Sequence, residues 1–259
     1  MILIIFIFGL VIGSFLNSVI FRMQAGEQFV WERSRCLKCS TILKIIDLIP
    51  ILSFFITKGK CRYCGHSISW QYPFVELSAG ILFVLYFLKF ETVFFSASLL
   101  SLILYSSFVL LLLSCLIVIF VYDLRTSYIP DAVVYLGVAV SIIYLLTNFS
   151  LITPFYLLGI AIPFVLFGSL VLISKEKWMG WGDVKLGVFM GLILGFPGIV
   201  VALYIAFITG AIVAILLLAA NQKTIKSEIP FGPFLVGATV ITMLYGNTII
   251  EKISRYFIF

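Results

Sequence analysis

The sequence has few charged residues and a single histidine. Only 11% of its 259 residues are charged, whereas a soluble domain carries about a quarter charged residues. A chain with this composition could not cover its own surface against water, so a soluble globular domain is excluded. Hydrophobic residues make up 63% of the chain, and its mean hydropathy is +1.24. We therefore expect a membrane protein with several spanning helices.

The first twenty residues lack the features of a cleaved signal peptide. They are apolar, but they have no basic n-region and no Ala-x-Ala-like cleavage site. The first basic residue, Arg22, follows the apolar run instead of preceding it. This order predicts an uncleaved first helix whose N-terminus lies outside the cell.

Long apolar runs predict the fold class. Eight runs predict an all-α, polytopic transmembrane bundle of about eight helices, at residues 2–21, 73–90, 98–121, 132–147, 154–174, 184–196, 198–220 and 233–249. The sixth run is short, and Gly-Phe-Pro-Gly at 195–198 predicts a tight turn into the seventh. We expect three parts: a first transmembrane helix at 1–21, a polar insert at 22–72 and a helical bundle at 73–259.

The basic residues predict the orientation of the bundle. With the N-terminus outside, 14 of the 17 basic residues fall on the inner side, and only Lys89, Lys252 and Arg255 fall outside. The opposite topology would reverse this bias, so we expect the insert to be cytoplasmic. The pI near 9.1 then reflects orientation and contact with anionic lipids. It gives no reason to expect a nucleic-acid partner.

Four of the five cysteines form two C-x-x-C pairs in the insert, with 21 residues between the pairs: Cys36, Cys39, Cys61 and Cys64. This spacing predicts a tetrahedral zinc site, structural because four thiolates complete the coordination. Two disulfides or a redox pair are the alternatives, which a reducing cytoplasmic location disfavours. His66 could replace one cysteine, but we expect it to be a surface residue. Cys115 lies in an apolar run, where we expect a buried small side chain.

Two acidic residues lie where apolar helices meet inner loops. Asp123 and Asp183 are 60 positions apart, and ionisable groups near membrane spans by default indicate function. Two carboxylates that share a site can hold one proton between them, so that one activates water and the other protonates the scissile group. Gly180 and Gly182 would let a substrate backbone approach closely. The structural alternatives are that Asp183 is an N-cap for a helix beginning at Val184 and that Asp123 is a partner of Arg125.

Asp131 and Lys185 have simpler interpretations. Asp131 follows Pro130, and proline followed by an acid is typical of a helix start. Lys185 could balance charge near Asp183, or its side chain could extend to the membrane surface.

Ordered motifs along nearly the whole chain resemble those of a known family. The motifs lie at residues 13–22, 33–36, 47–53, 59–64, 72–77, 123–131, 180–186 and 230–233. In this order and spacing the chain resembles the type IV prepilin peptidases, which are bifunctional leader peptidases and N-methyltransferases. A lone Gly-x-Gly-Asp would be weak support, but the ordered set is specific.

The resemblance implies that Asp123 and Asp183 are the catalytic pair of an intramembrane aspartic peptidase of the GxGD type. It implies a type IV prepilin or pseudopilin as substrate, cleaved after a glycine at the cytoplasmic face of a bacterial plasma membrane. Membrane lipids are the other expected partner. The motifs also suggest a set of substrate-positioning residues: Gly180, Gly182, Lys185, Pro230, Phe231 and Gly232.

The resemblance further implies N-methylation of the new N-terminus with S-adenosylmethionine as the methyl donor. No glycine-rich nucleotide loop after a strand is present in the sequence, so the donor site must be unconventional. We place it at the tetracysteine insert, with Tyr72, Glu76 and Gly80 as candidate residues. Glu76 could equally be an interfacial charge.

Two other functions fit parts of the pattern. A non-enzymatic transporter or assembly scaffold could use a zinc insert to dock a cytoplasmic partner, and it would tolerate loss of either aspartate. A preflagellin-like enzyme or a relative of the signal-peptide peptidases would share the Gly-x-Gly-Asp element. The tetracysteine insert favours the bifunctional prepilin enzyme over these relatives.

Overall fold

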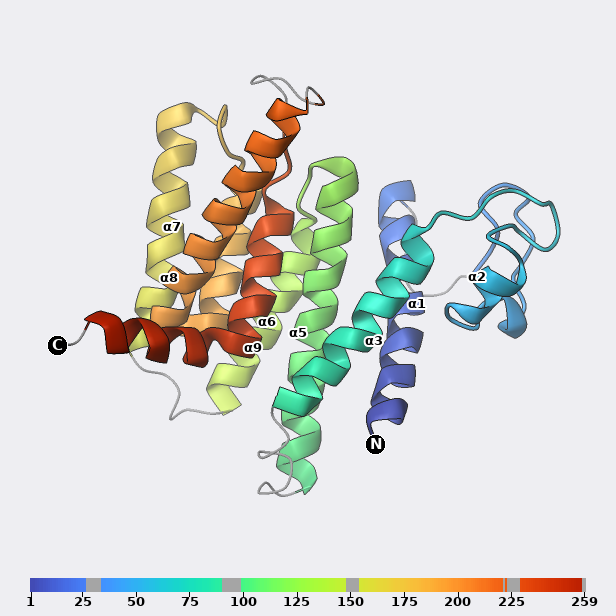
Figure 1. Cartoon of the computed structure of the whole chain (residues 1–259), viewed down its shortest axis with the longest axis horizontal. Helices are drawn as coiled ribbons and strands as arrows, with labels where there is room; N and C mark the ends of the chain where they lie inside the picture. The colour runs from blue at the N-terminus through green and yellow to red at the C-terminus, as the bar shows by residue number, and fades with distance from the viewer. Residues whose placement is uncertain (27–33, 90–98, 148–153, 221, 223–228, 258–259) are drawn as a thin grey trace. The chain divides into compact units, whose positions relative to one another are not determined.

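The computed structural model describes residues 1–26, 34–89, 99–147, 154–220, 222 and 229–257 (Figure 1). Three basic residues used to predict the orientation, Arg33, Lys223 and Lys226, lie outside the described residues. Every regular element in the described part is helical, apart from two isolated β-bridges in the insert. The predicted all-α class is therefore confirmed. The chain forms two compact units, Met1–Val118 and Ile119–Phe259.

The N-terminal unit is built on two long helices that pack along each other, α1 (Ile2–Ala25) and α3 (Gln71–Lys89). Over its described residues, from 34 on, the insert between them carries two short helices, η1 (Ile45–Asp47) and α2 (Leu52–Ile56). Helix α5 (Leu99–Thr126) begins in this unit and ends in the next.

Helices α1 and α3 approach closely because glycines line their contact. A Cβ atom on Gly9 would lie 2.7 Å from Cα of Gly80, and one on Gly13 would lie 2.6 Å from Cα of Glu76. Both distances are shorter than real Cβ contacts allow. Small residues four positions apart are typical of helix pairs in membranes, where close backbone approach drives association. The glycines therefore hold the start of α3 against α1.

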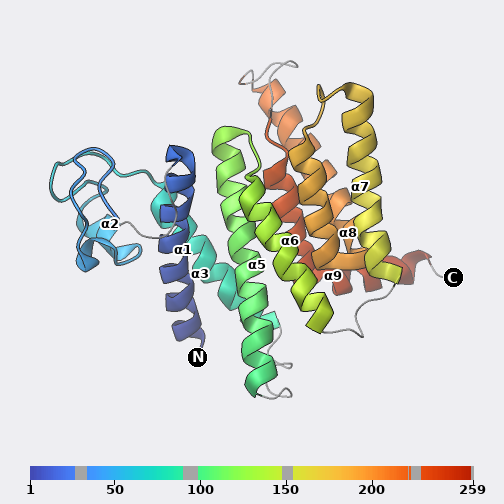
Figure 2. The same ribbon diagram turned by 180° about the vertical axis from the view of Figure 1, so that it is seen from behind.

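The C-terminal unit contains four further helices, α6 (Asp131–Thr147), α7 (Pro154–Ser174), α8 (Trp181–Ala219) and α9 (Gly232–Phe257). Helix α8 packs against the other three, and both ribbon views show them side by side (Figures 1 and 2). The last turns of α9, dark red in Figure 1, run in a different direction from its first part.

Helix α8 contains the sixth and seventh predicted spans and changes direction between them. Gly195 (φ 60°, ψ −174°) and Phe196 (φ −92°, ψ 140°) are not helical. The positive φ of Gly195 is a conformation that residues with a side chain rarely adopt. The tight turn predicted at this position is therefore confirmed. The other six predicted spans each overlap one described helix.

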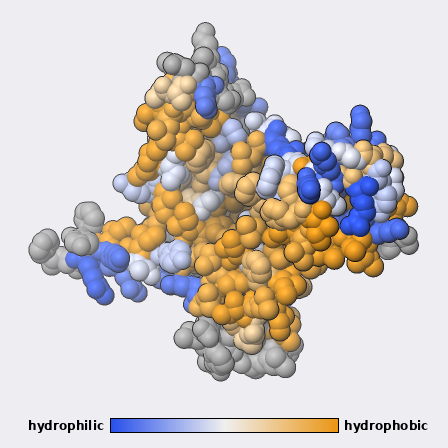
Figure 3. All heavy atoms as spheres, turned by 45° about the vertical axis from the view of Figure 1, so that its right-hand side comes forward, coloured by the Kyte–Doolittle hydropathy of each residue, from blue (hydrophilic) through white to orange (hydrophobic). Residues whose placement is uncertain are grey.

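In the part of the chain that the structure describes, six helices are long and apolar enough to cross a membrane: α1, α3, α5, α7, α8 and α9. Helix α6, of 17 residues, is a shorter apolar helix. Figure 3 shows hydrophobic residues over much of the visible sides of these helices, and hydrophilic residues gathered on the insert and near helix ends. The chain is a multi-pass membrane protein.

Candidate active site and metal centre

Asp123 lies in the last turn of α5 and is almost fully buried. Its side chain is 3% exposed, and its backbone carbonyl accepts a hydrogen bond from the Ser127 N–H at 2.8 Å, at the end of the helix. Oδ2 of Asp123 is buried and has no hydrogen-bond partner among the described residues. A buried polar atom without a partner is costly and uncommon, so this oxygen is available to a group other than the described residues.

Asp183 is the third residue of α8, which begins at Trp181 after the N-cap Gly180. Its backbone N–H donates to the Gly180 carbonyl at 3.2 Å, and its carboxylate accepts a hydrogen bond from the Gly180 backbone. This is the acidic half of a capping box. The alternative that Asp183 is itself the N-cap is wrong, because the helix begins at Trp181, three residues before Val184, and its N-cap is Gly180.

Three helix ends bring the two aspartates together within the C-terminal unit. Asp123 stands at the C-terminal end of α5 and Asp183 at the N-terminal end of α8, close enough for their charges to repel. The third end is the start of α9 at Gly232, whose backbone lies against the Asp123 carboxylate. A Cβ atom on Gly232 would collide with Oδ2 of Asp123. Glycine therefore provides the space that this carboxylate occupies.

The loop after Asp123 is attached to the start of α8 by an apolar and an ionic contact. Ile129 is buried, and its Cβ would lie 3.1 Å from a Cβ atom on Gly182. Asp131 binds Lys185 through both carboxylate oxygens, at 2.8 and 2.9 Å from Nζ. Lys185 also lies over the Tyr135 ring, 5.5 Å from its centroid. These contacts join the segments that carry the two aspartates.

The helix-start interpretation of Asp131 is confirmed, and the ion pair adds to it. Helix α6 begins at Asp131, and the Pro130 carbonyl accepts hydrogen bonds from the Val133 and Val134 N–H groups. The charge of Lys185 is matched by Asp131, not by Asp183.

Residues of the 230–233 motif precede and open α9. Phe231 contacts three other rings, with centroids 5.2 Å from Phe207 and 6.4 Å from both Phe167 and Phe234. This cluster fixes the backbone immediately before Gly232. Pro230 is half-buried beside it. Of the predicted substrate-positioning residues, the structure thus places Gly180, Gly182 and Gly232 next to the aspartates; Lys185 and Phe231 contact other side chains.

The four insert cysteines form one cluster. Their sulfur atoms all lie within 4.8 Å of one another, and Sγ of Cys36 and Sγ of Cys64 are 3.9 Å apart. Zinc–sulfur bonds of about 2.3 Å in a tetrahedron place sulfurs about 3.8 Å apart, so the cluster fits a zinc ion. All five cysteines are free thiols, which is contrary to the disulfide alternative.

Exposed His66 and buried Cys115 agree with their predicted surface and core positions.

Each C-x-x-C pair lies in a similar turn. A bridge joins Arg35 to Ile42 around the first pair, and another joins Lys60 to Ser67 around the second. Hydrogen bonds from the Thr41 hydroxyl and backbone lower the pKa of Cys39 to about 6. Backbone N–H groups of Tyr63 and Cys64 lower the pKa of Cys61. One cysteine in each turn therefore favours the thiolate that a metal needs, whereas burial and hydrogen bonds with the other three cysteines raise the pKa of Cys64 to about 12.

Asp47 links the segment between the two cysteine turns to the second turn, a role that the sequence does not predict. Its carboxylate binds Arg62 Nε at 2.9 Å and accepts hydrogen bonds from the Tyr63 hydroxyl at 2.8 Å and the Lys44 N–H at 3.1 Å. Partial burial raises the pKa of Asp47, but these hydrogen bonds and the Arg62 charge outweigh it and hold the pKa below its usual range. No local signal distinguishes Asp47 from a solvated acid.

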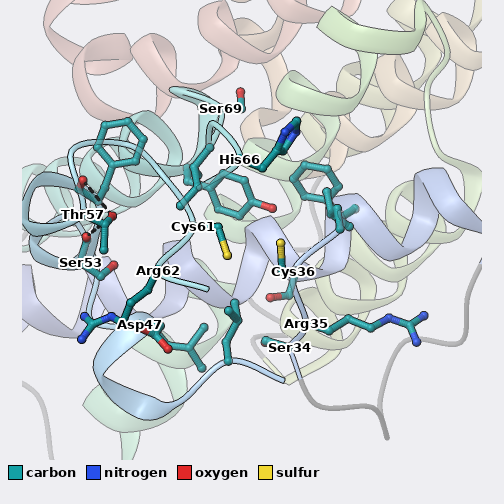
Figure 4. A pocket seen from close by; sticks show the side chains of 18 of the residues that line it. Ser34, Arg35, Cys36, Asp47, Ser53, Thr57, Cys61, Arg62, His66 and Ser69 are labelled. Atoms are coloured by element: carbon teal, nitrogen blue, oxygen red, sulfur yellow. Dashed lines mark hydrogen bonds and ion pairs between the residues drawn. The ribbon is translucent and has the colours of Figure 1, made fainter. Parts of the chain in front are cut away.

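A cavity of about 380 Å³ lies between the insert, the C-terminal half of α1 and the start of α3. Its lining includes Ser14 and Arg22 from α1, Tyr72 and Glu76 from α3, and the cysteine turns. Figure 4 shows the sulfurs of Cys36 and Cys61 pointing toward each other in its wall.

Glu76 is the buried acid of this cavity. It is 6% exposed, accepts a hydrogen bond from the Ile51 N–H at 2.7 Å and interacts with the Ser14 hydroxyl. Tyr72 stacks on Phe21, with ring centroids 5.2 Å apart. Gly80, the third candidate, is not among the lining residues and packs against Phe6 of α1. The structure therefore brings Tyr72 and Glu76 together at the cavity and gives Gly80 a place in the helix contact.

Comparisons with known proteins cover nearly the whole chain. Residues 7–90 match the bacterial peptidase A24 N-terminal domain, and residues 110–215 match the type IV leader peptidase family. A protein of Bacillus subtilis (strain 168) named prepilin leader peptidase/N-methyltransferase is 32% identical over 256 residues, which is 97% of each chain. A Legionella pneumophila protein of the same name is 30% identical over 99% of this chain and 95% of its own. No solved structure matches.

Metal content provides a direct test of the cysteine cluster. We expect the purified protein to carry about one zinc per chain, and Cys61→Ser to lose most of it and to melt at a lower temperature, because structural zinc contributes several kcal/mol to a small domain. Elemental analysis and thermal unfolding in detergent measure both effects. Cys115→Ser is the matched control and should keep its zinc. Protein without bound metal, whose stability Cys61→Ser leaves unchanged, would contradict the zinc site.

Proposed function

The chain belongs to the type IV leader peptidase family, and we propose that Asp123 and Asp183 are the catalytic pair with which it cleaves the leader peptide of a type IV prepilin or pseudopilin. The observation that carries this proposal is the meeting of the two carboxylates at the ends of α5 and α8. The buried, unpartnered Oδ2 of Asp123 supports it, because a catalytic carboxylate must leave an oxygen for water or substrate.

The pair cleaves a peptide bond by sharing one proton. The ionised carboxylate takes a proton from water as the water oxygen attacks the scissile carbonyl carbon, and the protonated carboxyl donates its proton to the carbonyl oxygen. The tetrahedral intermediate then collapses. The C–N bond breaks as a proton passes to the leaving nitrogen, and the pair returns to its singly protonated state. No serine, cysteine or metal takes part in this reaction.

Glycines determine which substrates fit. Gly182 and Gly232 pack against Ile129 and the Asp123 carboxylate, whereas Gly180 opens α8 with exposed backbone and no side chain. A substrate with a small residue before the cut can bring its carbonyl close to such backbone. This suits cleavage after a glycine that separates a short basic leader from an apolar helix.

Substrate orientation follows from the charge bias of the loops. The excess of basic residues on one side of the predicted topology favours a cytoplasmic active site in a bacterial plasma membrane. The apolar part of the prepilin would lie in the bilayer, with its leader at the inner surface. The scissile bond would then be near the membrane edge.

The second activity, methylation of the new N-terminus, is assigned to the insert at 22–72 together with the cavity beside it. S-adenosylmethionine supplies the methyl group when it is bound. The cavity of about 380 Å³ falls within the range of about 300–1,000 Å³ of small-molecule sites. Its aromatic Tyr72 and buried Glu76 suit a cationic ligand with an aromatic base, since rings and carboxylates both attract positive charge. The zinc cluster holds the wall of this cavity in place.

Removing either carboxylate should abolish leader cleavage. We expect Asp123→Asn and Asp183→Asn each to lower kcat by at least about 10²–10⁴-fold, because asparagine can neither take nor give the shared proton. The assay is incubation of purified protein with a prepilin, followed by mass spectrometry of the product N-terminus. Zinc content and melting temperature should match those of the unchanged protein.

Glu251→Gln, at an exposed position of α9, is the control for loss of one negative charge and should keep full activity. Retention of cleavage by either aspartate variant would contradict catalysis by the pair, and absence of cleavage by the unchanged protein would favour a non-enzymatic transporter or scaffold. With S-adenosylmethionine present, the same assay reports methylation as an added mass of one methyl group on the new N-terminus.

Leader cleavage should also depend on the space that Gly232 leaves for the Asp123 carboxylate. We expect Gly232→Ala to lower kcat by about 100-fold, because its Cβ would displace the Asp123 carboxylate and small displacements in a catalytic site have effects of this size. Gly237→Ala on the same helix meets no atom within 4 Å and should leave kcat unchanged. The two variants are compared in the prepilin assay; equal activities would show that Asp123 does not depend on this space.

A further inference from the structure

The segment between the two cysteine turns is apolar and exposed, although it lies in the part of the chain expected to be polar. Its exposed hydrophobic residues are Ile45, Ile46, Leu48, Ile49, Leu52, Phe55 and Ile56. Within this segment only Phe54 is buried. Soluble surfaces rarely carry so many large apolar side chains in one place. We refer to residues 45–56 together with Trp70 as the insert face.

The insert face is continuous with the surface of a spanning helix. The Trp70 ring lies 6.4 Å from Phe55 and 6.1 Å from Phe74, measured between centroids. Phe74 is in the first turn of α3, a helix of spanning length, and its side chain is 64% exposed. Trp70 immediately precedes α3, at the level where tryptophan is enriched in membrane proteins. A row of exposed rings thus leads from α2 to the lipid-facing start of α3.

The charges around the insert face suit a lipid surface. Lys44 precedes the segment, and Lys58 and Lys60 follow it, all with exposed side chains. The one acid within the segment, Asp47, is bound to Arg62 and Tyr63. The face is therefore apolar with a basic border, which is the pattern of segments that lie in the headgroup region of anionic membranes. Figure 3 shows hydrophobic residues along the lower side of the insert and hydrophilic residues on its upper and front sides.

We propose that the insert face binds the lipid bilayer that α1 and α3 cross, lying at the boundary between headgroups and acyl chains. The insert is then bound to the membrane surface and is not a free cytoplasmic domain.

The opposite side of the same segment forms part of the cavity wall. Ser53, Phe54 and Thr57 line the cavity, and the Ile51 N–H holds Glu76. Contact of Leu52, Phe55 and Ile56 with lipid therefore positions the wall that faces Glu76. In this arrangement the bilayer helps to shape the cavity without entering it.

Site-specific photocrosslinking tests this inference independently of enzymatic activity. A photoreactive residue replaces Ile56 in the full chain, reconstituted in nanodiscs of phosphatidylethanolamine and phosphatidylglycerol. Mass spectrometry should find lipid adducts at this site at least tenfold above those at Lys38, an exposed residue of the first cysteine turn. Zinc content confirms that the insert is folded, and Phe55 serves as a second site on the same face if the first variant loses its zinc.

Three results would overturn the inference. They are absence of lipid adducts at both sites, equal adducts at Lys38, and adducts to an added prepilin or to a second copy of the chain instead of lipid. Leader cleavage by the Asp123 and Asp183 pair is measured separately, so failure of one proposal leaves the other to be judged on its own.

Discussion

The site depends on one constraint: two carboxylates must stand close together at the ends of separate helices although their charges repel. The α8 start meets this constraint by giving Asp183 a backbone hydrogen bond from Gly180. The α9 start meets it by presenting Gly232, whose lack of a side chain leaves room for the Asp123 carboxylate. Helix N-termini also carry partial positive charge, which offsets part of the repulsion. Asp123 and Asp183 are thus held by backbone groups at the two helix starts.

Contacts around the two aspartates hold the segment that follows α5 against the start of α8. Ile129 packs on Gly182, and Asp131 binds Lys185, so the segment after Asp123 is attached twice to the segment that carries Asp183. The Gly-Trp-Gly-Asp sequence therefore serves packing as well as the substrate access proposed for it. In the other unit the cysteine turns and the segment that Asp47 holds through Arg62 and Tyr63 line a cavity whose wall also includes Glu76.

Features encoded over a few residues could be predicted from the sequence, and features that depend on distant contacts could not. The cysteine cluster follows from ligand spacing within two short turns, and the bend at Gly195 follows from local turn chemistry. The positions of Asp123 and Asp183 at helix ends, together with the family motifs, predict that they act as a pair. The fit of Gly232 against Asp123, the pairing of Asp131 with Lys185 and the role of Asp47 arise only when separate segments pack. The charged residues of the insert predict a polar segment, but the structure exposes isoleucines and leucines between the cysteine turns.

The most direct test of the central claim is the pH dependence of leader cleavage by the unchanged protein, measured as kcat across the range in which it remains folded. If one carboxylate must be ionised while the other holds the proton, kcat falls at both acidic and alkaline extremes, as two coupled ionisations require. A rate that stays constant over the whole range, or that depends on a single ionisation, would contradict catalysis by the pair.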